Sequence, residues 1–292
     1  MNISKCLLIA LLCLSTQAYG YQKNSTYSKG LHENIPMGKI DGVELSINIA
    51  FPEKTSVEPR PVLLLIHGGG FISGDKSTKN KQIIKFSKRG FVSASAMYRL
   101  SPEYRFPAAI DDIKLAVRFL KANAAKYHID PERIIVSGSS AGSYLAVMVG
   151  VTGNSNTFSD YGLYPEFDSS VRAVTAQSAP IGDFTQPKYG EQKTIKRLIP
   201  LNYTDKQAIL SAMSPMSYLD IKDPPFFLSH GDKDPIVPVE LSREFVSKLE
   251  SINHEFEYHE VNGGTHSFSR SVPKKSKVVF SAYMNFLKKW SK

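Results

Sequence analysis

One uninterrupted apolar run limits the possible folds of this 292-residue chain more than any other feature. It extends from Val62 to Ile66, between a proline and a histidine, and three glycines follow the histidine. A run of this length bounded by turn residues predicts a strand buried on both faces, because a strand with one face in water would alternate apolar and polar residues. Such strands belong to parallel sheets with helices on both sides.

The rest of the chain alternates between strand and helix patterns. Strands are predicted at residues 43–51, 91–98, 134–136, 171–176, 226–230 and 255–261, and helices at 108–123, 144–149, 239–252 and 280–290. This order predicts an α/β fold with a mostly parallel sheet and helices on both faces. Residues 21–40 are expected to form an irregular leader, and residues 153–215 either border a binding cleft or make long surface connections. No repeat or linker divides the chain, so residues 21–292 are expected to form a single domain.

The N-terminus has the three parts of an export signal. Lys5 precedes the apolar stretch 6–14, and the small residues Ala18 and Gly20 follow. This pattern predicts a signal peptide over residues 1–20 and export to the periplasm or the medium. A retained membrane anchor is the weaker alternative, because the stretch is too short to span a bilayer as a stable helix. Both cysteines lie in this segment, so the exported protein would have no disulfide and no cysteine nucleophile.

Charge and composition exclude several classes of function. The chain has 36 Lys and Arg against 27 Asp and Glu, a formal net charge of +9, but the basic residues are scattered except near the C-terminus. No helix has a basic face and no aromatic-basic signature is present, so we expect no nucleic-acid partner. The excess charge favours solubility, with an acidic polysaccharide substrate as the alternative. No metal-binding motif is present, and we expect no metal and no cofactor.

A nucleophile motif lies between a predicted strand and a predicted helix. The segment Gly138-Ser139-Ser140-Ala141-Gly142 has the Gly-x-Ser-x-Gly pattern. In this pattern a strained turn lifts one serine hydroxyl above the sheet, and the glycines allow the strand and the helix to approach each other. The flanking strand and helix are the context that this mechanism requires, so they make the motif more specific than its five residues alone.

Glycines after the first buried strand could hold an oxyanion. The segment His67-Gly68-Gly69-Gly70 follows that strand. Backbone N–H groups of such glycines, together with the N–H of the residue after the nucleophile, here Ala141, form an oxyanion hole in hydrolases that carry this motif. A flexible turn at a strand end is the alternative.

A serine nucleophile needs a base that is oriented by an acid. Asp232 and Asp234 follow the end of the predicted strand 226–230, and His266 lies in a glycine-rich loop after the next strand. Of the other histidines, His67 is expected to orient the glycine loop and His230 to support the acid loop. Surface or packing roles are expected for His32, His128, His254 and His259.

These motifs carry a family resemblance. The chain resembles secreted α/β-hydrolase esterases, close to the hormone-sensitive-lipase-like and the feruloyl and acetyl-xylan esterase-like groups. Besides the motifs above, the matching segments are 98–103, 106–108 and 129–134. The resemblance covers nearly the whole chain after the signal and implies an α/β-hydrolase fold.

The resemblance also implies a role for each matching residue. Ser140 would be the nucleophile, His266 the base and Asp234 the acid, which leaves Asp232 as a neighbour. The oxyanion hole would be formed by the backbone N–H groups of Gly69, Gly70 and Ala141.

Three departures from the family pattern refine this expectation. Ser143 replaces a frequent second glycine and predicts slightly looser packing of the helix after the nucleophile. Ser139 replaces an acidic residue of many lipase relatives and favours the carbohydrate-esterase side. Few residues precede His67 after the signal, so we expect little N-terminal cap and an open cleft.

The sequence therefore predicts a secreted serine carboxylic ester hydrolase with a Ser-His-Asp triad. Its expected partner is a small-molecule or polysaccharide-linked ester, with a short acyl group or a carbohydrate-linked ester bond. Two alternatives are a serine peptidase of the prolyl-oligopeptidase type and a non-catalytic binding protein with the hydrolase fold. The peptidase is disfavoured, because the chain has no room for a gating domain.

Overall fold

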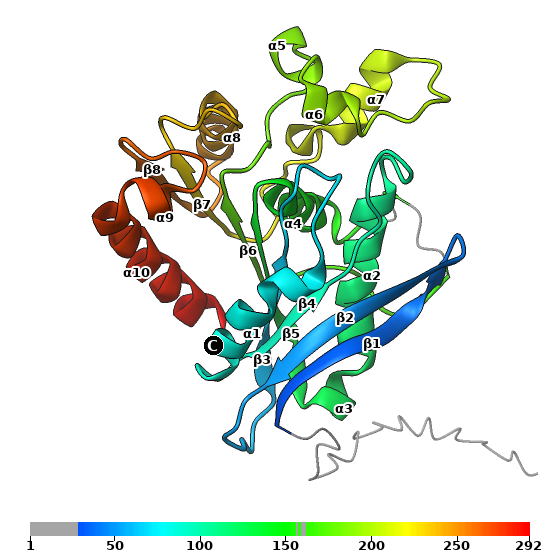
Figure 1. Ribbon diagram of the computed structural model, residues 1–292, viewed down its shortest axis with the longest axis vertical. Helices are drawn as coiled ribbons and strands as arrows, with labels where there is room; N and C mark the ends of the chain where they lie inside the picture. Colours follow the sequence, from blue (N-terminus) through cyan, green and yellow to red (C-terminus); the bar gives the residue numbers. More distant parts are fainter. Residues whose placement is uncertain (1–28, 156, 159–161) are drawn as a thin grey trace, which may run out of the picture.

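An eight-stranded sheet forms the centre of the computed structural model, which describes residues 29–155, 157–158 and 162–292 (Figure 1). The strands are β1 (Gly30–Ile40), β2 (Val43–Phe51), β3 (Arg60–Ile66), β4 (Val92–Ala96), β5 (Ile129–Ser139), β6 (Ala173–Gln177), β7 (Phe226–Gly231) and β8 (Phe256–Val261). Their order across the sheet is β1-β2-β4-β3-β5-β6-β7-β8. β2 pairs antiparallel with β1 and β4, and all other neighbours are parallel. The predicted α/β class with a mostly parallel sheet is confirmed.

Side-chain alternation in β3 explains why helices cover both faces of the sheet. Val62, Leu64 and Ile66 belong to the core on one face, whereas Leu63 and Leu65 belong to the core on the other. The first core is closed by α2 (Ala108–Ala122), α3 (Ala124–Tyr127), α4 (Ala141–Thr152) and α8 (Glu240–Ser251). The second is closed by α1 (Asn80–Ser87) and α10 (Pro273–Trp290). Because neither face meets water, the strand needs no polar side.

Short helices gather beyond the carboxyl ends of the parallel strands. They are η1 (Lys76–Lys79), α5 (Pro187–Gly190), α6 (Lys193–Lys196), α7 (Lys206–Met213), η2 (Pro215–Ser217) and α9 (Phe268–Ser271). In Figure 1, α5, α6 and α7 stand together above α4. These three helices belong to the segment 153–215. The sequence alone did not decide whether this segment borders a cleft or forms surface connections.

The prediction of an irregular leader is wrong for residues 30–40, which form β1. This strand lacks a regular alternation, because register shifts interrupt its pairing with β2 and Asn34 has a positive φ of 56°. From residue 29 to the start of β3 the only regular elements are β1 and β2, so this described part of the chain places no helical cap over the sheet. The predicted signal peptide, residues 1–20, lies outside the described residues. None of the helices in the described ranges is long and apolar enough to cross a membrane.

Candidate active site

A strained turn between β5 and α4 presents Ser140. Its backbone has φ 55° and ψ −125°, a region that non-glycine residues rarely occupy. A side chain at Gly138 would overlap the carbonyl group of Gly142, and one at Gly142 would overlap the carbonyl oxygen of Ile66. The two glycines of the motif therefore allow the strand, the turn and the helix to approach, as the sequence pattern predicts.

Ser143 binds α4 to the neighbouring strand β6. Its side chain is fully buried, its hydroxyl donates to the carbonyl oxygen of Gln177 at 2.8 Å, and it accepts from the Gln177 N–H at 2.9 Å. The N–H of Ser140 donates to the same carbonyl at 2.9 Å. The serine hydroxyl thus makes two hydrogen bonds to β6 that a glycine would lack.

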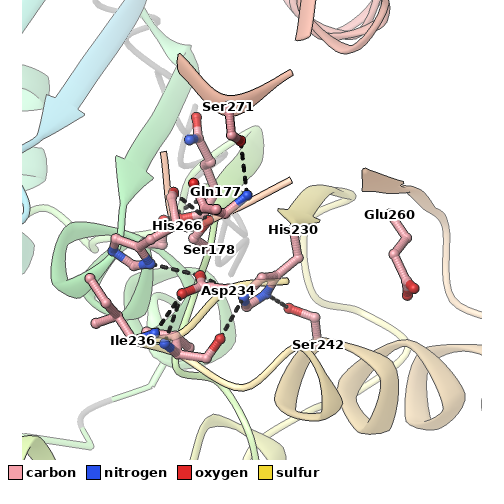
Figure 2. Close-up of polar contacts among 12 residues, drawn as sticks. Gln177, Ser178, His230, Asp234, Ile236, Ser242, Glu260, His266 and Ser271 are labelled. Carbon is pink, nitrogen blue, oxygen red and sulfur yellow. Dashed lines mark hydrogen bonds and ion pairs between the residues drawn. The ribbon is translucent and has the colours of Figure 1, made fainter. Parts of the chain in front are cut away.

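Two histidines and one carboxylate form a hydrogen-bonded chain (Figure 2). His266 Nδ1 lies 2.7 Å from Asp234 Oδ2, and His230 Nε2 lies 3.1 Å from the same oxygen. The other oxygen, Asp234 Oδ1, accepts from the backbone N–H groups of Ile236 and Val237 at 2.8 and 3.0 Å. The loop after β7 and the loop after β8 thus meet at one carboxylate.

The protonation states of this chain follow from its partners. Burial acts to raise the pKa of Asp234, but the bonds from His230, His266 and the two amides outweigh it and hold that pKa well below its usual range. The carboxylate is therefore ionised and only accepts, so His266 Nδ1 carries the hydrogen of their bond. This leaves Nε2 of His266 free to accept a proton.

His230 contacts the site more directly than the sequence predicts. It is fully buried; its Nε2 also lies 3.0 Å from the carbonyl oxygen of Val237, and its Nδ1 lies 2.7 Å from Ser242 Oγ. A carbonyl only accepts, so Nε2 carries a hydrogen that it shares with Asp234. Its place directly before the acid loop predicted support for the turn, but not the direct bond to the carboxylate.

The glycine loop after β3 is held by His67. Its ring is buried and stacks on Tyr98 with ring centroids 4.3 Å apart, and its Nδ1 donates to the carbonyl oxygen of Gly68 at 2.8 Å. Burial lowers the pKa of His67. Gly69 and Gly70 have positive φ values of 133° and 60°, and a side chain at Gly69 would overlap the backbone of Ser73. His67 therefore contacts the loop in the way that an orienting role requires.

A cleft of about 730 Å³ brings the proposed site residues together. Its wall includes Ser140 and His266, and it also includes the predicted oxyanion-hole residues Gly69, Gly70 and Ala141. Asp234 lies behind His266, and its side chain is fully buried. Among the hydrogen bonds of the described residues, none joins Ser140 to His266; bonds of this kind are often long before a substrate is bound.

The segment 153–215 contributes to the same wall. Gln177, Ser178 and Pro180 come from its middle, and Gln192, Thr194 and Ile195 come from the region of α6. Part of this segment therefore borders the cleft that contains Ser140 and His266.

The remaining candidate residues lie elsewhere. Asp232 Oδ1 accepts from the N–H of Gly263 at 2.6 Å and takes no part in the histidine chain. His128 and His254 contact backbone carbonyl oxygens, and His259 packs against Phe227. No group of three or more His, Cys, Asp or Glu residues in the described part of the chain is arranged to hold a metal ion.

Sheet order, helices on both faces and a serine on a strained strand-to-helix turn define the α/β-hydrolase fold, and this chain has that fold. Comparison with known proteins then identifies the family. The profile of the BD-FAE family matches residues 47–249, and the chain belongs to that family.

Several named relatives and solved structures are similar to this chain. Esterase LipQ of Mycobacterium tuberculosis is 32% identical over 78% of this chain, and esterase LipC of the same organism is 30% identical over 72%. The chain spans about half the length of these two relatives, 55% and 54%. A bifunctional GH43-CE protein of Bacteroides eggerthii superposes with a TM-score of 0.74 at 28% identity, covering 90% of this chain and 38% of that one. Thermogutta terrifontis esterase 2 shares the fold at a TM-score of 0.73 and 24% identity, covering 89% of this chain and 94% of the esterase.

Proposed function

We propose that this protein is a serine carboxylic ester hydrolase in which Ser140, His266 and Asp234 act as a catalytic triad. The observation that carries the proposal is the bond between His266 Nδ1 and an ionised, buried Asp234, with the other side of the imidazole in a cleft that also exposes Ser140. The names of the relatives LipQ and LipC support ester hydrolysis as the reaction.

The first half of the proposed reaction forms an acyl-enzyme. Ser140 Oγ attacks the ester carbonyl carbon while His266 Nε2 takes the hydroxyl proton, and Asp234 stabilises the imidazolium that results. The carbonyl oxygen becomes an oxyanion, which the N–H groups of Gly69, Gly70 and Ala141 would stabilise. The tetrahedral intermediate then collapses, the bond to the alcohol oxygen breaks, and His266 returns its proton to the leaving alcohol.

The second half releases the acid. Water replaces the alcohol in the cleft and gives a proton to His266 as its oxygen attacks the acyl carbon. A second oxyanion intermediate collapses, and the proton passes from His266 to Ser140 Oγ. The net change is one ester and one water converted to one acid and one alcohol, with the enzyme restored.

We infer that the substrates are short-chain acyl esters or esters linked to carbohydrate. Two features support this class: residues 29–59 place no helical cap over the sheet, and solved structures with this fold include a bifunctional GH43-CE protein and a carbohydrate esterase from gut microbiota. Export of the protein by the N-terminal signal would bring it to such substrates and remains part of the proposal.

Substitution of the nucleophile tests the reaction. Ser140→Ala is expected to lower kcat for 4-nitrophenyl acetate by about 10⁴–10⁶-fold, because the attacking oxygen is lost, while thermal unfolding changes little. Ser139→Ala, the other serine of the same turn, is the matched control and should retain far more activity. A fluorophosphonate probe should label the wild type and fail to label Ser140→Ala.

Two results would contradict the proposal. One is wild-type turnover by Ser140→Ala. The other is efficient release from a proline-linked chromogenic peptide with no turnover of esters, which would point to a peptidase.

A further inference from the structure

The cleft that contains Ser140 has an unusual distribution of charge. None of the described residues that line it is Asp or Glu, and Lys79, at the end of η1, is its one lysine or arginine. The other polar groups of the wall are neutral hydroxyls and amides, apart from His266; the amides belong to Gln82, Gln177 and Gln192. Among the described residues of the wall, Lys79 is therefore the one lysine or arginine that a negatively charged ligand could meet.

Lys79 is half-buried and lies next to the nucleophile turn. Its Nζ donates to Ser139 Oγ at 3.3 Å, one residue before Ser140. Burial lowers the pKa of Lys79. An ammonium group has three donors and loses hydration free energy when it is removed from water, so a single neutral acceptor satisfies it poorly.

Asp75, the N-cap residue of η1 and four residues before Lys79, has other partners. The Asp75 carboxylate accepts from the N–H of Ser77 at 2.8 Å and lies 3.9 Å from the ammonium of Lys76. In the described ranges, Lys79 forms no ion pair with a carboxylate of the chain. Its charge is therefore available to a ligand in the cleft.

We propose that Lys79 is a specificity-determining residue that binds a carboxylate of the substrate, so that the preferred esters carry a free carboxylate near the ester bond. The proposal rests on the proposed function. A carboxylate can enter on either side of the bond: on the acyl side in the half-ester of a dicarboxylic acid, or on the alcohol side in the ester of a hydroxy acid such as a uronic acid. Both sources present the same charge to Lys79.

Two pairs of substrates distinguish a carboxylate on the acyl side from one on the alcohol side. Within each pair, one ester carries the negative charge and the other is neutral. Monoethyl succinate against ethyl butyrate tests the acyl side, and 4-acetoxybenzoate against 4-acetoxybenzamide tests the alcohol side. The measured quantity is the ratio of kcat/KM for the charged substrate to that for the neutral one. For at least one pair we expect a wild-type ratio of about ten or more, arising mainly from a lower KM, because a charge-assisted hydrogen bond of this kind changes binding by about tenfold or more.

Three variants test whether Lys79 causes the preference. Lys79→Met should lower the ratio about tenfold, whereas Lys79→Arg, which keeps the charge, should retain most of it. Lys81→Met is the matched control: Lys81 is exposed on α1, does not line the cleft, and carries the same charge, so its loss should leave the ratio unchanged. Thermal unfolding of each variant shows whether the fold is retained.

Two outcomes would overturn the inference. One is a wild-type ratio near one for both pairs; the other is an equal loss of kcat/KM on charged and neutral substrates in Lys79→Met, which would show that Lys79 only positions the turn through Ser139. If the wild type still hydrolyses the neutral esters through Ser140 in either case, the proposed function stands and only this inference fails. If the wild type hydrolyses none of the four esters, both fail.

Discussion

Two aspartates whose side chains are shielded from water have opposite surroundings. Asp234, in the loop after β7, accepts hydrogen bonds from two imidazoles and two backbone amides. Asp111, in the first turn of α2, is 0% exposed, and neither of its carboxylate oxygens has a hydrogen-bond partner in the described part of the chain. Burial acts to raise the pKa of both, but only Asp111 ends above its usual range, at about 7, because burial and the neighbouring Asp112 outweigh the nearby cations.

This difference indicates that hydrogen-bond donors, and not burial, decide whether a buried carboxylate stays ionised. Around Asp234 the chain brings together two loops and the buried imidazole of His230, and in the proposed mechanism the resulting anion stabilises the protonated imidazole of His266. Nothing in the proposed mechanism uses Asp111. The contrast therefore separates a carboxylate whose ionised form its hydrogen-bond donors stabilise from one whose ionised form burial destabilises.

The largest effect is expected when the negative charge of Asp234 is removed. Asp234→Asn keeps the shape of the side chain, but its amide can present an N–H to His266 Nδ1 and so favour the wrong imidazole tautomer. We expect kcat for 4-nitrophenyl acetate to fall about 10⁴-fold. Steady-state kinetics of the purified variant measures the fall in kcat, and thermal unfolding measured in parallel shows whether the fold is retained.

Asp232→Asn is the control for Asp234→Asn. Asp232 lies two residues earlier in the same loop, but its carboxylate accepts from the N–H of Gly263 rather than from an imidazole. Its substitution should change kcat far less. An equal loss in the two variants would mean that the loop, and not the charge of Asp234, matters for catalysis.

Much of the fold follows from local sequence patterns. The strand predicted at residues 43–51 has the same bounds as β2, and the apolar run 62–66 lies in β3, because alternation and continuous apolarity report directly which faces are buried. The glycine motifs could also be located, since close backbone approach excludes side chains at Gly138 and Gly142. The wall of the cleft then includes Ser140, His266 and the predicted oxyanion-hole residues, with Asp234 behind His266.

What the sequence did not reveal depends on contacts between distant segments. β1 is a strand only because β2 pairs with it, and its own residues show no alternation. Lys79 reaches the cleft because η1 turns back towards Ser139, sixty positions later, and no local pattern signals that contact. The bond from His230 to Asp234 likewise depends on how the loop after β7 folds back on its strand.

A smaller effect is expected from His230, the second imidazole at Asp234. His230→Phe keeps a ring in the core but removes one donor, so we expect kcat to fall about tenfold, the equivalent of about 1.4 kcal/mol in the activation free energy. KM should change little, because the cleft wall does not include His230. His230→Gln restores an N–H donor and should recover part of kcat; an equal loss in both variants would assign His230 to packing alone.

The smallest expected effect concerns Asp111 and has a defined pH dependence. The folded protein holds a proton on Asp111 up to a pKa of about 7, whereas the unfolded chain releases it near pH 4. Between these values the folded state binds more protons, so the contribution of Asp111 to the free energy of unfolding falls as the pH rises. Asp111→Asn should therefore be more stable than the wild type by about 1 kcal/mol at pH 8, because an unpartnered amide costs less to bury than an unpartnered charge.

The pH dependence, rather than the size of the gain, makes the Asp111 prediction specific. Denaturant unfolding at pH 8 and pH 5 should show the advantage of Asp111→Asn shrinking at the lower pH, where the wild-type carboxyl is already neutral in the folded state. Asp112→Asn makes the same chemical change one residue along, but Asp112 pairs with the buried guanidinium of Arg99 at 2.9 Å, so its loss should destabilise the protein at both pH values. A gain for Asp111→Asn of equal size at both pH values would show that the folded protein binds no more protons at Asp111 than the unfolded chain does. The pKa of Asp111 would then not be raised, and the contrast with Asp234 would no longer hold.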